Sequence, residues 1–125
     1  MQDHPSAIAV LDIAIAHLRD NTLPDLKGRA AFDMRVTLNA LQLVRRTLVL
    51  TPESDAAERT RLEALLGEAG DLDSLNRALC SRIEAGELDL ASPGLIAHLR
   101  ATALEKLAVD QPSYSAYRRA TEAKD

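Results

Sequence analysis

The longest uninterrupted apolar pattern of the chain lies between Arg29 and Leu50. This segment has no glycine or proline, and at about 100° per residue its apolar side chains cover more than half of a helix circumference. Its polar side chains form one narrow stripe, which contains Arg35, Asn39, Gln42 and Arg46. The apolar side of an ordinary surface helix is narrower than this. We therefore predict that the segment is the central helix of a bundle and has neighbouring helices on most sides.

One further helix is predicted before the central one and another directly after it. Ser6 to Asp20 has apolar side chains at helical spacing, and the connector NTLPDLKG that follows it contains proline and glycine. Thr51 and Pro52 are expected to end the central helix, because threonine caps helices and proline suits the first position of a new one. The third helix then runs to Gly67. It is the most highly charged segment and is expected to lie outermost, with Leu62, Leu65 and Leu66 as its buried side chains.

The remaining sequence predicts a fourth helix, a last main helix and a short terminal one. An apolar stripe marks the fourth helix and contains Leu72, Leu75, Leu79 and Ile83. Ser92 and Pro93 begin the last main helix, which extends to Val109 before Pro112 blocks its continuation. Residues 115–125 are expected to form a short helix with a frayed end.

No segment alternates with the two-residue period of a strand. We predict an all-α fold: a single-domain helical bundle, residues 1–125, of about five main helices plus a short C-terminal helix.

Composition narrows the classes of function. Aromatic residues make up only 2% of the chain, so it lacks the stacking surfaces of single-stranded nucleic-acid binders. A net charge of −4 argues against binding to DNA or to anionic membranes. Cys80 is the single cysteine, which fits a reducing compartment, and we expect its thiol to be buried. The apolar stretch 7–18 is short and contains Asp12, so it predicts no signal peptide or membrane span, and we expect a cytoplasmic protein.

No sequence pattern predicts catalysis, a cofactor or a metal. His4, His17 and His98 lie far apart, whereas a zinc site needs three or four convergent ligands. The five glycines occur singly, and none belongs to a phosphate-binding loop or to a strained nucleophile turn. The charged side chains of the third helix, such as Glu58 and Arg61, are expected to be solvated. We therefore predict no catalytic residue, cofactor or metal, and leave open whether the isolated chain is an enzyme.

A few charged residues fall in sectors that the pattern predicts to be buried. The last main helix is expected to bury Leu95, Ile96, Leu99, Ala103, Leu104 and Leu107. Arg100 and Asp110 lie in the same sector, as Asp33 does on the central helix, and buried charges must be paired. One interpretation is a network of interhelical salt bridges that fixes the helix register. The other is a groove that binds a partner protein or an anionic ligand and is lined by Arg35, Asn39, Arg46 and Arg100. Arginine suits either role.

Four segments, taken in order and with their spacing, resemble a known family. They are QDHPSA, GRAAFDMRVTLNAL, DLDSLNRALCSRIEAGELDL and the closing LRATALEKLAVDQPSY, which is the most specific. The family consists of small, uncharacterised bacterial all-helical proteins encoded beside an acyl-CoA dehydrogenase and a kinase with an aminoglycoside-phosphotransferase-like fold. The positions typical of it are Phe32, Arg35, Asn39, Leu99, Arg100, Lys106, Leu107, Asp110, Pro112 and Tyr114. Glu105 and Gln111 depart mildly from the pattern, where Asp and Asn are expected.

The resemblance implies an accessory protein. In levulinate and 4-hydroxy-acid degradation, a small protein of this kind works with the kinase-like partner to phosphorylate a 4-hydroxyacyl-CoA, which the acyl-CoA dehydrogenase-like enzyme then processes. The ATP site and the catalytic base would belong to the larger subunit. The residues expected to bind a partner or ligand are Arg35, Asn39, Arg46, Arg100, Asp110 and Tyr114, since arginine and tyrosine are favoured interface anchors.

Two alternatives to an accessory subunit stay open. The chain is either a small-ligand or acyl-CoA-binding helical module that uses the arginine groove, or a self-associating structural protein. The wide apolar side of the central helix makes a homo-oligomer plausible in the absence of a partner.

Overall fold

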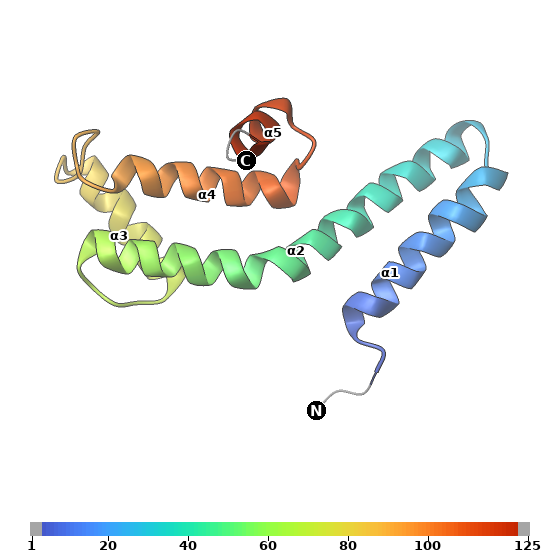
Figure 1. Cartoon of the computed structure of the whole chain (residues 1–125), viewed down its shortest axis with the longest axis horizontal. Coiled ribbons are helices and arrows are strands. Elements are labelled where there is room, and N and C mark those ends of the chain that lie inside the picture. Colours follow the sequence, from blue (N-terminus) through green and yellow to red (C-terminus); the bar gives the residue numbers. More distant parts are fainter. Residues whose placement is uncertain (1–3, 123–125) are drawn as a thin grey trace. The chain divides into compact units, whose positions relative to one another are not determined.

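The computed structural model describes residues 4–122, and within them all regular structure is helical (Figure 1). The all-α prediction is confirmed. The chain divides into two compact units, Met1–Leu50 and Thr51–Asp125. Whether they form the predicted single domain stays a prediction, and each unit is taken by itself.

The N-terminal unit begins with α1 (Ala7–His17), which Ser6 caps by accepting a hydrogen bond from the Ala9 N–H at 3.2 Å. The helical path does not end at the predicted position. It continues as a π-helical turn, η1 (Leu18–Thr22), and a 3-10 turn, η2 (Leu23–Asp25). Most of the predicted connector is therefore helical.

The second helix, α2 (Gly28–Leu66), is 39 residues long and continues through Pro52. The predicted break at this proline is wrong. Proline cannot donate a hydrogen bond to the Leu48 carbonyl, and a proline inside a helix costs about 3 kcal/mol. Ser54 Oγ donates to the neighbouring Thr51 carbonyl at 3.1 Å, and the packing of residues 51–66 offsets the cost. The described residues thus form four main helices and a short one, instead of five and a short one.

The C-terminal unit contains the second part of α2 and three further helices: α3 (Leu72–Glu84), α4 (Leu95–Asp110) and α5 (Ser115–Glu122). Asp71 caps α3 by accepting the Ser74 N–H at 2.9 Å. The predicted short terminal helix is confirmed, while its predicted frayed end at 123–125 lies outside the described residues.

The start of α4 differs from the prediction. It is preceded by Gly94, with φ +87°, rather than capped by Ser92. Ser92 instead bonds within the preceding loop, where its Oγ accepts the Asp89 N–H at 2.9 Å.

The core of the C-terminal unit is a cluster of five leucines, which are Leu62, Leu66, Leu75, Leu79 and Leu95. Leu62 and Leu66 belong to the segment predicted to lie outermost, and Leu62 is fully buried. The expected burial of Leu62 and Leu66 is confirmed, whereas the expected outermost position of the segment is wrong, because these two leucines, spaced four residues apart on one helix face, belong to the core cluster. The second part of α2 is the central element of this unit.

The predicted wrapping of Arg29–Leu50 is also wrong. Among the described residues of the N-terminal unit, the buried hydrophobics are Ile15, Ala31 and Leu38. Phe32 and Val36 on α2 are 56% and 52% exposed. Within this unit α1 lies along one side of α2, and an ion pair between Asp12 and Arg45 joins the two helices.

Cys80 is exposed, and the prediction of a buried thiol is wrong. It follows the buried Leu79 on α3. Adjacent residues on a helix point about 100° apart, which is enough to turn the thiol from the core to the surface.

Candidate functional site

The best-defined polar contact in the C-terminal unit joins α2 to α4. Arg61 Nη2 lies 2.6 Å from Glu105 Oε2, and Nη1 lies 2.9 Å from Oε1. Arg61 also donates to Thr102 Oγ1 at 3.4 Å. The pKa of Arg61 is raised, chiefly by the hydrogen bond to Glu105, so the guanidinium keeps its positive charge. The prediction that Arg61 is ordinary solvated surface is wrong.

His98 lies on the same side of α4 and is 3% exposed. Its pKa is lowered from the ordinary value, first by burial and second by the charge of Arg61, while Glu58 and Glu105 act in the opposite direction. Neither His98 Nδ1 nor Arg61 Nε has a hydrogen-bond partner among residues 4–122. His98 is therefore a neutral imidazole inside the helix interface.

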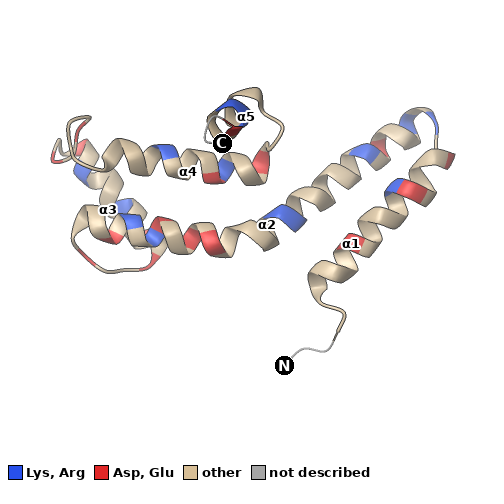
Figure 2. Ribbon diagram, viewed as in Figure 1, with Lys and Arg blue, Asp and Glu red and all other residues tan. Residues whose placement is uncertain are grey.

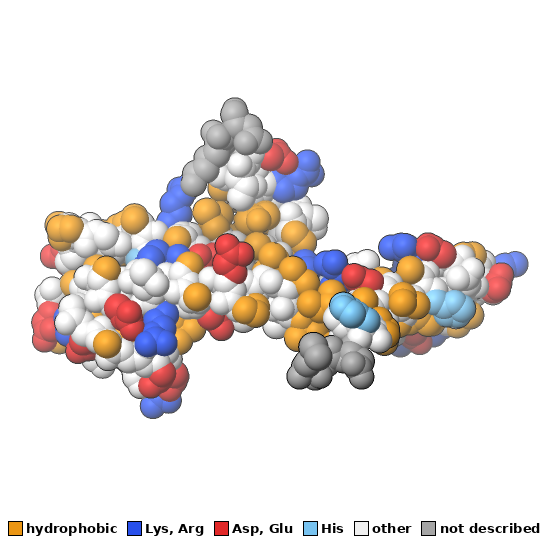
Figure 3. Space-filling view, turned by 60° about the horizontal axis from the view of Figure 1, so that its bottom comes forward, with side chains coloured by type: hydrophobic (Ala, Val, Ile, Leu, Met, Phe, Trp, Pro, Cys, Tyr) orange, Lys and Arg blue, Asp and Glu red, His pale blue; other side chains and the backbone are white. Residues whose placement is uncertain are grey.

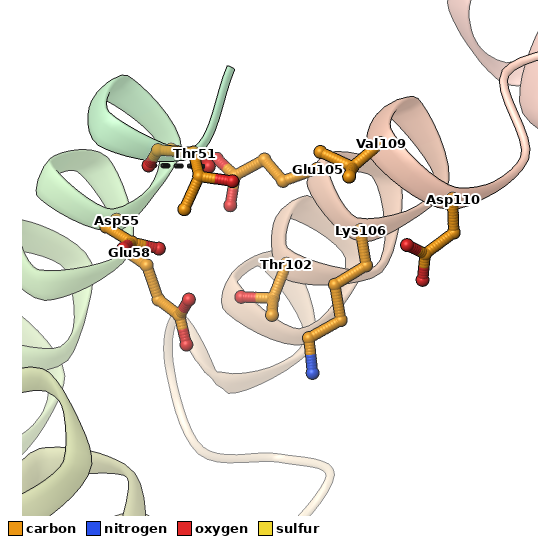
Figure 4. A pocket seen from close by; sticks show the side chains of 9 residues that line it. Thr51, Asp55, Glu58, Thr102, Glu105, Lys106, Val109 and Asp110 are labelled. Atoms are coloured by element: carbon orange, nitrogen blue, oxygen red, sulfur yellow. Dashed lines mark hydrogen bonds between the residues drawn. The ribbon is translucent and has the colours of Figure 1, made fainter. Parts of the chain in front are cut away.

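An acidic cleft of about 180 Å³ lies beside this contact, between α2 and α4. Its labelled side chains point into the space between the two helices (Figure 4). It is lined by Thr51, Ser54, Asp55, Glu58, Thr102, Glu105, Lys106, Val109 and Asp110.

The polar groups of the cleft are mostly used to hold helices together. Both carboxylate oxygens of Glu105 accept from Arg61, and Glu58 Oε1 accepts from Asn76 of α3 at 3.0 Å. The Ser54 hydroxyl donates to a backbone carbonyl. A hydroxyl or thiol nucleophile is commonly activated by an adjacent general base to which it is hydrogen-bonded. Within the described part of the chain, the cleft offers no such pair, and no group of three or more His, Cys, Asp or Glu is placed to hold a metal ion.

The N-terminal unit has a basic pocket of about 450 Å³ between α1 and α2. It is lined by Asp12, Ile15, Ala16, Arg19, Gln42, Arg45 and Arg46. Arg45 is paired with Asp12, and Arg19 is paired with Asp20 at 2.8 Å. These carboxylates raise the pKa of both arginines and neutralise part of the positive charge that an anion would meet.

The structure separates the predicted site residues into two groups. Arg35, Asn39 and Arg46 all lie on the first part of α2, and Arg46 lines the basic pocket. Asp33, for which a distant partner was expected, pairs with Arg29 of its own helix at 2.9 Å.

The second group, Arg100, Asp110 and Tyr114, lies at the C-terminal end of the chain. Arg100 and Tyr114 are exposed, and Asp110 lines the acidic cleft. The prediction that Arg100 is buried is wrong. The side of α4 that meets α2 includes Leu95 and His98, so only part of the predicted apolar stripe faces inward.

The inner face of α4 is formed by Leu95, His98, Thr102 and Glu105, of which the sequence predicted only Leu95 to be buried. Their spacings of three, four and three residues are those of a helix face. The spacing is the available signal. The prediction did not use this spacing, because three of the four residues are polar and the predicted buried faces were defined by apolar residues alone.

Apolar side chains remain on the surface of both units, and many are visible on the face drawn in Figure 3. On α4, Ile96 and Leu99 are exposed, contrary to the prediction that they are buried. On α2 the exposed set is Phe32, Val36, Leu43, Val44, Leu48, Val49 and Leu50. No described helix is both long enough and apolar enough to cross a membrane.

A family model for a domain of unknown function, DUF6285, matches residues 24–114. The match covers most of the chain, from η2 to the residue before α5, and the chain belongs to this family. No curated protein and no solved structure is significantly similar to it.

Proposed function

We propose that this member of the DUF6285 family is a non-catalytic accessory subunit of a phosphotransferase-family kinase that acts on hydroxyacyl-CoA in the bacterial cytoplasm. The observation that carries the proposal is the exposed apolar surface of α2 and α4. Monomeric proteins rarely expose large contiguous apolar patches, and such patches usually mark interaction sites. An acyl-CoA dehydrogenase-like enzyme would act next in the same catabolic sequence.

The placement of the glycines supports an accessory role. Gly28, Gly67, Gly86 and Gly94 have positive φ and each lies alone at or beside a helix end. Phosphate-binding loops instead bring several backbone N–H groups of one glycine-rich turn toward a phosphate. The ATP site would then belong to the kinase-like subunit, as the resemblance of the closing segment implies.

Co-expression with the kinase-like protein of the same genome tests the proposal. We expect a stable heterocomplex, and ATP-dependent phosphorylation of 4-hydroxyvaleryl-CoA that requires both chains. Each chain alone serves as the control. Full kinase activity in the absence of this protein would remove the proposal.

The basic pocket favours a second candidate function, an acyl-CoA-binding module. Arg46 lines the pocket together with two further arginines, and guanidinium groups suit phosphate oxygens. Calorimetry of the isolated protein with a CoA thioester separates the two candidates. Binding that is lost in Arg46→Ala would favour the module, whereas the accessory subunit requires no binding by the isolated chain.

A further inference from the structure

Four exposed apolar residues on the first part of α2 form one narrow line, which we call the α2 seam: Phe32, Val36, Leu43 and Leu50. Their spacings are four, seven and seven residues. At about 100° per residue the four side chains point within about 40° of one another. Spacings of this kind are those of a helix that packs lengthwise against another helix. The seam therefore has the form of a helix-binding surface.

The side of α2 that meets α1 points elsewhere. Ala31 and Leu38 are buried and Arg45 pairs with Asp12 of α1. Leu38 and Leu43 are five residues apart, which turns their side chains about 140° from each other on a helix. Within the N-terminal unit, α1 thus leaves the seam uncovered.

One edge of the seam is basic and polar. Viewed along the helix axis, this edge begins beside Phe32 and contains Asn39, Arg46 and Arg35. Their side chains point about 20°, 40° and 60° away from that of Phe32, all in the same rotational direction. Residues 29–50 contain four arginines and one carboxylate, Asp33, which is paired with Arg29. Figure 2 shows basic residues on this part of α2, while acidic ones predominate further along the helix.

This charge decides between a second copy of the chain and a different partner. A second copy that packs its own α2 seam against this one would bring the same four arginines and the same single, already paired carboxylate. It therefore offers no negative charge to the basic edge, and like charges across an interface are unfavourable. A helix with acidic residues beside its apolar stripe supplies both the apolar contact and the opposite charge.

We propose that the α2 seam is the docking surface for an amphipathic helix of another protein, with Asp and Glu flanking the apolar stripe of that helix. The inference rests on the proposed function only in taking the kinase-like subunit as the first partner to be tested. Leu43 and Leu50 provide the apolar contact, and Arg35 pairs with a partner carboxylate.

A pair of neighbouring substitutions tests the apolar contact. Leu43→Asp is expected to weaken the complex with the kinase-like subunit about thirtyfold, as for a central interface residue. Val44→Asp is the control, since Val44 is 49% exposed against 38% for Leu43 but points about 100° away from it. Circular dichroism should show both variants folded. Equal affinity for wild type and Leu43→Asp would overturn the proposal.

A charge reversal tests the acidic character of the partner. Arg35→Glu is expected to weaken binding about tenfold, because it places a carboxylate opposite carboxylates. Arg119→Glu on α5 changes the net charge by the same amount at an exposed position and is expected to have no effect. Tighter binding by Arg35→Glu would overturn the acidic assignment.

A photo-crosslinking residue at position 43 of the full chain, expressed in its own host, separates this inference from the proposed function. A crosslink to an acidic amphipathic helix of the kinase-like subunit supports both. A crosslink to such a helix of another protein supports the docking surface and removes the kinase role. A crosslink to a second copy, or to a segment without acidic residues, overturns the docking surface. The same holds if position 43 gives no higher crosslinking yield than the exposed position 90.

Discussion

Arg61 and Glu105 form a two-bond ion pair that ties α4 to the central segment of the C-terminal unit. Each side chain is about one-quarter exposed, at 26% and 27%, so the pair is partly shielded from water. Removing one member would leave the other without its partner in a semi-buried position, which costs more than the loss of a surface pair.

Glu105→Gln should lower the free energy of unfolding by about 1–3 kcal/mol, because Arg61 keeps its charge but loses its bidentate acceptor. Urea denaturation measures the change. Glu63→Gln is the matched control, since Glu63 pairs with Arg59 on the same helix surface at 3.0 Å, and its loss should cost about 0.5 kcal/mol or less. Equal losses of unfolding free energy in the two variants would mean that the interhelical pair contributes no more stability than an exposed pair within one helix.

His98 should make the protein less stable in mild acid. Its pKa in the folded state is lowered by burial and by Arg61, so the unfolded chain takes up a proton before the folded one. The free energy of unfolding should therefore fall as pH drops through the ordinary histidine pKa of about 6.5.

The measurement is urea denaturation at several pH values between about 8 and 5, around the ordinary pKa. His98→Leu should flatten the decline in stability, whatever its effect at neutral pH. His17→Leu, at an exposed position on α1, is the control and should keep the wild-type slope. A slope that His98→Leu leaves unchanged contradicts the assignment of the decline to this residue.

Leu62→Ala should destabilise the C-terminal unit by about 2–5 kcal/mol, because the fully buried side chain leaves a cavity among four other leucines. Leu90→Ala removes the same atoms from a side chain that is 82% exposed and should change stability by less than about 0.5 kcal/mol. Thermal unfolding of the two variants measures the difference. A mild effect at position 62 would argue against the leucine cluster as the core.

Pro52→Ala should stabilise the protein by about 1–3 kcal/mol, since it restores a hydrogen-bond donor inside α2 and removes the ring from the preceding turn. Without the proline ring the unfolded chain of the variant has more conformational entropy, which reduces this gain by a smaller amount. Pro112→Ala, beyond the end of α4, is the control and should give no such gain. A less stable Pro52→Ala variant would show that the proline fits its site without strain.

The sequence predicted helix position better than helix orientation. The α3 leucines at 75 and 79 were correctly expected on one apolar stripe, because regular apolar spacing defines them. Pro52 was misread because proline is common at the first position of a helix, so the residue alone does not distinguish the start of a helix from its interior.

The candidate site was less predictable than the fold. Three of the residues expected to bind a partner do lie on one edge of α2, because a regular helix fixes the directions of its side chains. They are Arg35, Asn39 and Arg46. The Arg61–Glu105 pair joins residues that are 44 positions apart, and single-sequence periodicity carries no signal for that pairing. Apolar spacing correctly predicted the burial of Leu95, but it also predicted the burial of Ile96 and Leu99, which are exposed.

The polar inner face of α4 gives the two attachments of the C-terminal unit different physical sensitivities. The leucine cluster depends on hydrophobic attraction, which weakens on cooling. The attachment of α4 beyond Leu95 includes the Arg61–Glu105 ion pair, which dissolved salt screens in part. Cooling should therefore weaken the leucine cluster, and added salt should weaken the polar contact of α4 with α2.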